Sequence, residues 1–183
     1  MANLLASAAA RASAVDVAIP TAADVPALIA LVNALATEPN FLFINPIDPV
    51  AGVAIVKSHL DAIAANRNEI VLVAREGSKL VGLVTGLRGT HPARRGAIDI
   101  GLGVLPDHRR RGIGQVLMLG LERWALSVGC HRLQLRVTTE NAAAFALYRK
   151  CGFLVEGVYH AGAMIEGRYY DDFEMAKLIQ LAG

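Results

Sequence analysis

The sequence predicts an α/β domain, built on a twisted sheet of about six or seven strands with helices packed against it. Three observations lead to this expectation. Short apolar or alternating runs typical of strands are interleaved with longer stretches of helical periodicity along the 183 residues. The apolar content of 54% is high, but much of it is alanine, which suits close packing of helices on a sheet. No apolar run reaches the length of a membrane span, and a chain of this length suits one domain.

The first third of the chain predicts one strand and two helices. Residues 15–19 suit a short strand, and Pro20 opens a helix that runs to about residue 36. Residues 38–49 hold three prolines and two phenylalanines, a composition typical of a long loop. A second helix is expected over residues 50–65. The apolar stripe of the first helix is formed by Leu28, Leu31, Val32 and Leu35.

The middle of the chain predicts three strands and a helix. Residues 70–75 and 80–87 are apolar runs, and the turn-forming residues between them indicate a hairpin. Residues 94–104 are expected to form the next strand. The helix that follows begins after Gly112 and ends near Gly129, a residue suited to a helix C-terminus.

The last third predicts a strand, a helix and a closing pair of strands. Residues 132–137 alternate leucine and valine with arginine and glutamine, which is typical of a half-exposed strand. A helix is expected from Asn141, a residue type favoured at helix N-caps. Residues 153–159 and 168–178 are expected to be the closing strands. The turn region between them is bounded by Gly162 and Gly167.

Composition and charge narrow the functional class. The formal net charge of +2 is too small to argue for nucleic-acid binding, and no aromatic residues are interleaved with the clustered arginines. Cys130 and Cys151 make neither a metal-ligand spacing nor a disulfide framework, so no metal is expected. A reduced cytoplasmic protein without a membrane segment is the simplest expectation. Residues 1–14 are expected to be an N-terminal tail and residues 15–183 a single domain, and a homodimer stays open.

The most informative stretch joins the strand that ends at Val104 to the helix after Gly112. It holds three consecutive arginines and two glycines, Gly112 and Gly114. A helix N-terminus presents unpaired N–H groups, glycine lets a bulky anion approach the main chain, and arginine offers forked donors to phosphate. The stretch lacks the Lys-Ser/Thr pair of a Walker A loop and the third glycine of a dinucleotide fingerprint. It therefore predicts another kind of pyrophosphate loop, with a solvated basic turn as the alternative.

The pattern R-x-x-G-x-G at residues 109–114 resembles the coenzyme A pyrophosphate loop of the GNAT acetyltransferase superfamily. Residues 141–153 resemble a second motif of that superfamily, N-x-x-A-x-x-L-Y-x-x-x-G-F, at every named position. The resemblance covers roughly residues 15–178. It implies the GNAT fold, a mixed, twisted sheet with helices on both faces, and acetyl-CoA as co-substrate. The implied coenzyme-binding residues are Leu102, Val104, Arg109, Arg110, Arg111, Gly112, Ile113, Gly114, Gln115, Asn141 and Tyr148.

The implied reaction is acetyl transfer from acetyl-CoA to a primary amine. A backbone N–H on the strand before the loop would stabilise the negative thioester oxygen, and Leu102 or Val104 is the candidate. Two glycines in this strand, Gly101 and Gly103, are expected where the sheet splays and a ligand approaches the backbone, and relief of crowding against the next helix is the alternative. For the leaving thiolate, the candidate acid is Tyr148.

The general base is the less defined catalytic role. Asp99 is the candidate, ahead of His91, although an aspartate is short for a direct role. A structural, hydrogen-bonded carboxylate is the alternative for Asp99.

The acceptor pocket implied by the resemblance is built from the loop between the first two helices and from the closing hairpin. The candidates are Phe41 and Phe43 in the loop, with Glu166, Tyr170 and Asp171 in the hairpin. Carboxylates there suit an acceptor that carries an ammonium group, and aromatic rings can enclose it by cation–π contact. Solvated hairpin charges are the alternative.

The sequence therefore predicts an N-acetyltransferase that acts on the primary amine of a small molecule, such as an amino acid or a polyamine. A protein N-terminus or a lysine is the alternative acceptor. An inactive sensor that binds acyl-CoA is the alternative of another class, and Tyr148 argues against it.

Overall fold

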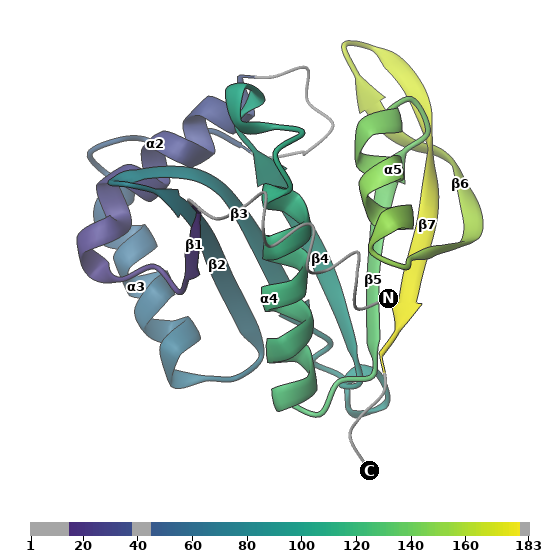
Figure 1. Ribbon diagram of the computed structural model, residues 1–183, viewed down its shortest axis with the longest axis horizontal. Helices are drawn as coiled ribbons and strands as arrows, with labels where there is room; N and C mark the ends of the chain where they lie inside the picture. Colours follow the sequence, from purple (N-terminus) through teal and green to yellow (C-terminus); the bar gives the residue numbers. More distant parts are fainter. Residues whose placement is uncertain (1–14, 38–44, 180–183) are drawn as a thin grey trace.

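The computed structural model describes residues 15–37 and 45–179 of the chain. These residues form one seven-stranded sheet in the order β1-β2-β3-β4-β5-β7-β6 (Figure 1). Neighbouring strands are antiparallel except β4 and β5, which are parallel, so the expected mixed sheet is confirmed. The strands are β1 (Asp16–Ala18), β2 (Glu69–Glu76), β3 (Lys79–Arg88), β4 (Ala97–Val104), β5 (Arg132–Thr138), β6 (Leu154–Ile165) and β7 (Arg168–Leu178).

Four α-helices lie in the described ranges: α2 (Val25–Ala36), α3 (Gly52–Ala65), α4 (Ile113–Ser127) and α5 (Ala142–Lys150). The first helix begins later than expected. Asp24 accepts a hydrogen bond from the Thr21 N–H (2.8 Å), and residues 22–24 form a short 3-10 turn before α2. The strand expected over residues 94–104 begins only at Ala97, because a 3-10 turn over Pro92–Arg94 precedes it.

Helices cover both faces of the sheet, as expected. On one face, α4 packs through Leu117 and Leu121 in a core that also holds Ile98 and Leu133 of the sheet. Figure 1 shows α4 along the middle of the sheet and α5 beside β5 and β7. On the other face, α2 and α3 pack in a second core against β2 and β3. None of the helices in the described ranges has the length and hydropathy of a membrane-spanning segment.

The central pair of strands, β4 and β5, separates along its length. The paired residues run from Ala97–Arg132 to Asp99–Gln134, although β4 continues to Val104 and β5 to Thr138. Figure 1 shows the two strands diverging from this paired end. The expected splay of the sheet is therefore confirmed. We call the space between residues 100–104 of β4 and 135–138 of β5 the β4–β5 gap.

The closing hairpin differs from the expectation. The strand expected over residues 153–159 continues to Ile165, and the turn to β7 contains only Glu166 and Gly167. Both turn residues have positive φ, +51° and +78°, as the two-residue hairpin turn with matching twist requires.

A bulge in β6 replaces the longer turn that the glycines suggested. The pairing moves from Tyr159–Asp172 to Ala163–Tyr170, so residues 160–162 stand opposite Asp171 alone and β6 has two extra residues there. Ala161 adopts a φ of +50°, and its N–H donates to Asp171 Oδ1 (2.8 Å). The sequence gives no sign of this bulge, because alanine rarely takes positive φ and the stabilising carboxylate lies on another strand.

Candidate functional site

The loop between β4 and α4 has the geometry of an anion-binding turn. The main chain leaves β4, makes a 3-10 turn over Pro106–His108 and enters α4. Arg110 and Gly112 both have positive φ, +62° and +85°. The N–H groups from Arg110 through Gly114 have no hydrogen-bond acceptor among the described residues. Successive unpaired N–H groups at a helix N-terminus suit a phosphate group.

The side chains of the three arginines make different contacts. Arg109 Nε donates to the carbonyl oxygen of Val104 (2.9 Å), which ties the loop to the end of β4. Arg111 forms an ion pair with Glu76 at the β2–β3 turn and holds the pKa of that carboxyl below its ordinary value. Arg110 has no partner within residues 15–37 and 45–179, and it is exposed. Its guanidinium is thus the one of the three without a competing contact in those ranges.

Gly112 and Gly114 are glycines for different reasons. Gly112 ends the loop at a φ that residues with a Cβ rarely adopt. Gly114 is buried, and a Cβ there would lie 2.8 Å from Cδ2 of Leu147 on α5. Gly114 therefore lets α4 and α5 pack closely. The sequence expectation that both glycines admit an anion is not supported at Gly114 by this contact.

Helix α5 begins and ends with two of the predicted site residues. Asn141 is the N-cap, and its Oδ1 accepts a hydrogen bond from the Ala144 N–H (3.1 Å). Tyr148 is 6% exposed and lies in the core cluster that also contains Leu102 of β4 and Val137 of β5, and its ring centroid is 5.9 Å from that of Phe153. Burial raises the pKa of the Tyr148 hydroxyl, so the group stays protonated at neutral pH. That hydroxyl has no hydrogen-bond partner in the described part of the chain.

The β4–β5 gap presents backbone groups of β4. The N–H of Leu105, just past the strand end, donates to Val81 in β3 (3.0 Å), and β4 continues in register with β3. Because the direction of the N–H groups alternates along a strand, those of Leu102 and Val104 point away from β3, toward the gap. No residue of β5 is paired opposite them. Both candidate donors for the thioester oxygen therefore lie at the gap.

Asp99 lies where β4 and β5 are still paired, at the closed end of the gap. Its Oδ1 accepts a hydrogen bond from Gln134 Nε2 (2.8 Å), and Gln134 Oε1 accepts one from Arg132 Nε (2.8 Å). Arg132 in turn forms an ion pair with Glu156. This network fixes the orientation of an otherwise exposed carboxylate. This network is compatible with Asp99 as a positioned general base, and equally with Asp99 as a structural, hydrogen-bonded carboxylate.

Of the residues predicted for the acceptor pocket, the structure describes Glu166, Tyr170 and Asp171. Phe41 and Phe43 lie outside the described residues. Glu166 is exposed in the turn at the tip of the hairpin. Tyr170 is half-buried, with the guanidinium carbon of Arg168 4.9 Å from its ring centroid.

Asp171 uses both of its carboxylate oxygens inside the hairpin. Oδ1 accepts from the Ala161 N–H, and Oδ2 lies 2.9 Å from Nδ1 of His160. These contacts, the Ala161 hydrogen bond foremost, lower the pKa of the Asp171 carboxyl. Its contacts are those of a group that stabilises the β6 bulge.

Several polar residues that the sequence analysis did not assign share the sheet face of Asp99. Alternation along the strands places their side chains on that face, because Asp99 pairs with Gln134, and β5 pairs with β7 without a register shift. The alternation in residues 132–137 was the available signal, but the pairing with β7 was not visible in it. These residues are Gln134, Arg136, Thr138, Asp172 and Glu174.

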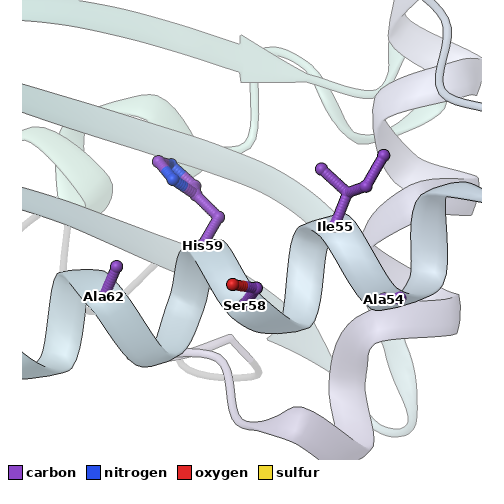
Figure 2. A pocket seen from close by; sticks show the side chains of 5 residues that line it. All are labelled: Ala54, Ile55, Ser58, His59 and Ala62. Carbon is purple, nitrogen blue, oxygen red and sulfur yellow. The ribbon is translucent and has the colours of Figure 1, made fainter.

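A shallow hollow on the outer side of α3 lies apart from this site. Figure 2 shows that its lining residues all come from one helix, Ala54, Ile55, Ser58, His59 and Ala62. His59 Nε2 lies 3.1 Å from a carboxylate oxygen of Glu69. No residue of the β4–α4 loop or of the β4–β5 gap lines this hollow.

Comparisons with known proteins agree with this geometry. The sequence model of the Acetyltransferase (GNAT) family matches residues 39–153. An acetyltransferase of Pectobacterium atrosepticum is 34% identical over 103 residues, which are 56% of this chain and 70% of that protein. The chain spans 55% to 70% of the length of the first two curated bacterial acetyltransferases that it matches.

Solved structures match over most of the chain. A GNAT-family acetyltransferase from Streptococcus pneumoniae superimposes with a TM-score of 0.84 and 29% identity, covering 91% of this chain and 99% of that one. Spermidine N-acetyltransferase from Vibrio cholerae, solved with CoA and spermine, superimposes with a TM-score of 0.73 and 22% identity, over 91% and 96% of the two chains. The second likeness concerns the fold alone. The chain belongs to the GNAT family of acetyltransferases, and acetyl-CoA is its co-substrate.

Proposed function

We propose that this enzyme transfers the acetyl group of acetyl-CoA to a primary amine of a small molecule. The observation that carries the proposal is the β4–β5 gap, with unpaired N–H groups at the β4–α4 loop on one side and polar side chains on the face of Asp99. A primary amine is a nucleophile that reacts with a thioester once it has lost its proton.

The coenzyme residues are proposed around the loop. The main-chain N–H groups from Arg110 to Gly114 would bind the pyrophosphate, and the guanidinium of Arg110 would add charge. Ile113 and Gln115 belong to the first turn of α4, where such an anion would bind. The amide nitrogen of Asn141 remains available to a ligand, because only its oxygen is used in the cap. Gly112 fits this site, since its conformation excludes a bulkier residue.

Three groups of the chain are proposed for the chemical step. The N–H of Leu102 or Val104 would donate to the thioester oxygen as that oxygen becomes negative. Tyr148 would donate its hydroxyl proton toward the leaving sulfur. Because burial raises the pKa of this phenol, hydrogen bonding to the sulfur is favoured over formation of a phenolate. Asp99 would take the proton of the amine, directly or through a water molecule.

The nature of the acceptor is the finer part of the proposal. The spermidine enzyme of similar fold acts on a small amine, and Glu166, Tyr170 and Asp171 lie on the closing hairpin. A protein N-terminus or lysine stays the alternative. A panel of amino acids, polyamines, simple amines and short peptides, followed by release of the CoA thiol, separates these acceptors. Transfer to peptides alone would contradict a small-molecule acceptor, and acetyl-CoA binding without any transfer would indicate the sensor.

A homodimer is proposed from the edge of the sheet. β6 is an edge strand of twelve residues, and Leu154, Val158 and Met164 on it are 61%, 46% and 62% exposed. A long edge strand with exposed apolar side chains is a template for pairing with another chain. Light scattering should give a molar mass twice that of one chain. The Met164→Glu substitution should lower this measured mass toward that of one chain. A wild-type monomer at micromolar concentration would contradict the proposal.

A reducing, cytoplasmic compartment is proposed from the two cysteines. Both are free thiols, with Cys130 buried and Cys151 half-buried. Burial raises the pKa of the Cys151 thiol to about 11, which leaves it protonated and unreactive. Fractionation of cells that express the tagged protein checks this compartment.

A further inference from the structure

Two polar side chains are buried side by side near the open end of the β4–β5 gap. Thr138 at the end of β5 is 1% exposed, and Asp172, its register partner on β7, is 4% exposed. Within residues 15–37 and 45–179, they are the two buried polar residues. Thr138 Oγ1 and Asp172 Oδ1 both lack a hydrogen-bond partner among the described residues. Buried polar oxygens are nearly always paired, and a buried carboxylate needs a donor or a positive charge.

The neighbouring cations are engaged elsewhere. The guanidinium carbon of Arg136 lies 4.2 Å from the ring centroid of Tyr159, the residue paired with Asp172 on its other side. His160 lies against Asp171. No ion pair forms between Asp172 and any cationic side chain in the described residues. The Asp172 carboxyl therefore has no cationic partner in that part of the molecule.

Thr138 and Asp172 also lie where an acceptor at the β4–β5 gap could reach them. Asp99 and Gln134 are the last paired residues of β4 and β5, and Gly103 and Thr138 each lie four residues beyond them, on the two sides of the gap. Alternation places both on the face of the sheet that carries Asp99. Asp172 lies one strand beyond Thr138 on this face.

The bulge in β6 brings Gly162 close to the carboxylate of Asp172. A Cβ at Gly162 would lie 2.8 Å from Asp172 Oδ2, so any side chain there would press against that oxygen. Glycine at this place leaves room for the second carboxylate oxygen. The bulge itself is held by Asp171, which explains why two adjacent aspartates differ so strongly in their contacts.

We propose that Asp172, together with Thr138, binds a positively charged nitrogen of the acceptor that is distinct from the amine that is acetylated. The proposal rests on the proposed function. An ammonium group has several N–H donors and one positive charge, which matches a carboxylate and a hydroxyl that lack donors. Rotation about the terminal bonds of both side chains turns these oxygens toward the ligand. The acceptor class is thus a small molecule with one reacting amine and a second cationic nitrogen.

The experiment compares linear α,ω-diamines of three to six carbons with the n-alkylamines of equal length, and measures KM and kcat for each. The wild-type enzyme should have the lower KM for the diamines. Asp172→Asn should raise the KM for the preferred diamine about ten- to hundredfold, as for a lost charged hydrogen bond. The KM values for the monoamine and for acetyl-CoA should stay unchanged. The matched control is Asp16→Asn, an exposed aspartate on β1 at the other end of the sheet, which should leave the preference for diamines intact.

Thr138→Val keeps the shape of the side chain and removes only the hydroxyl. It should raise the KM for the diamine by a smaller factor, about two- to tenfold. If Asp172→Asn does not fold, this variant and the wild-type preference for diamines decide the matter. Equal kcat/KM for diamines and monoamines, or an equal loss for both in the variants, would overturn the inference and leave the proposed function standing. If no amine is acetylated although acetyl-CoA binds, the proposed function fails, and the inference fails with it.

Discussion

The two sides of the β4–β5 gap use different chemistry. At the β4–α4 loop the groups available to a ligand are main-chain N–H groups, held by the positive φ of Arg110 and Gly112. At the β5–β7 side they are side-chain oxygens, Thr138 and Asp172, held by strand register. The first set offers donors and the second offers acceptors. The molecule is therefore suited to an anionic ligand at one side and a cationic one at the other.

This difference indicates which side of the gap determines specificity for the coenzyme and which determines specificity for the acceptor. Main-chain donors bind any phosphate of suitable shape, so the loop side can serve one common coenzyme. Side-chain acceptors change with single substitutions, so the strand side can be adapted to a particular acceptor. Substitutions on each side show whether coenzyme binding and acceptor binding are separable.

The largest expected effect comes from Gly112→Val. Valine rarely adopts a φ of +85°, so the loop must rearrange and its N–H groups lose their common direction. The affinity for acetyl-CoA, measured by titration calorimetry, should fall about a hundredfold or more. The control is Gly129→Val, because Gly129 has a φ of +74° with open space around its Cβ position, at the far end of α4. Unchanged affinity in Gly112→Val would remove the loop from coenzyme binding.

Tyr148→Phe should lower kcat about a hundredfold, the lower end for a lost hydrogen-bond donor to a developing negative charge, and leave acetyl-CoA affinity nearly unchanged. Tyr169→Phe is the control, since Tyr169 is 68% exposed on the hairpin. Single-turnover kinetics should be used, so that chemistry is the step measured. An unaltered rate there would show that the buried hydroxyl has no part in the step.

Gly114→Ala should destabilise the protein more than it weakens the coenzyme site. The new Cβ would meet Leu147 at 2.8 Å, and overpacking of this kind costs about 1–3 kcal/mol. Urea unfolding measures the loss, and the double variant with Leu147→Val should recover part of it. If acetyl-CoA affinity drops while stability does not, Gly114 serves the ligand rather than the packing.

Arg110→Ala and Arg111→Ala should differ although the residues are adjacent. Arg110 has no partner in the described residues, so its loss should weaken acetyl-CoA binding about three- to tenfold. This loss of affinity should be smaller at high salt, because salt screens the attraction between an exposed guanidinium and a phosphate. Arg111 is already neutralised by Glu76, and its loss should matter less. Equal effects of the two substitutions on calorimetric affinity would contradict this assignment.

The smallest effect is the acid sensitivity of the Glu76 contact. Arg111 lowers the pKa of Glu76 from its ordinary value of 4.5. A lowered pKa stabilises the folded protein above pH 4.5, and this stability is lost as the pH falls through the lowered pKa. Glu76→Gln should therefore lower the melting temperature slightly at pH 7 and approach the wild-type value at pH 3. A difference between the two proteins that is independent of pH would exclude this ion pair as its cause.

The sequence predicted the fold well, because the fold depends on local signals. Gly112 marks the start of α4, Asn141 marks the start of α5, and the alternation in residues 132–137 marks a strand. Periodicity also placed the core stripe of α2, although its 3-10 start depends on Asp24.

The remaining contacts depend on residues far apart in the chain. Glu76 reaches Arg111 across 35 residues, and Asp99 meets Gln134 across 35 residues. Thr138 and Asp172 meet only through the register of β5 and β7. Neighbouring aspartates on the hairpin look alike in sequence, and only the β6 bulge distinguishes Asp171 from Asp172.

The divergence of β4 and β5 also has a consequence for how the chain folds during synthesis. Residues of β5 form three register pairs with β4 and seven with β7. Strands β1 to β4 pair in sequence, β1 with β2, β2 with β3 and β3 with β4, and all four precede β5 in the chain. The N-terminal half of the sheet can therefore form as soon as residue 104 has left the ribosome. β5 keeps an open edge until residues 168–178 emerge, and such an edge is prone to aggregation. Slow translation of the final hairpin should therefore prolong the period in which the nascent chain depends on chaperones.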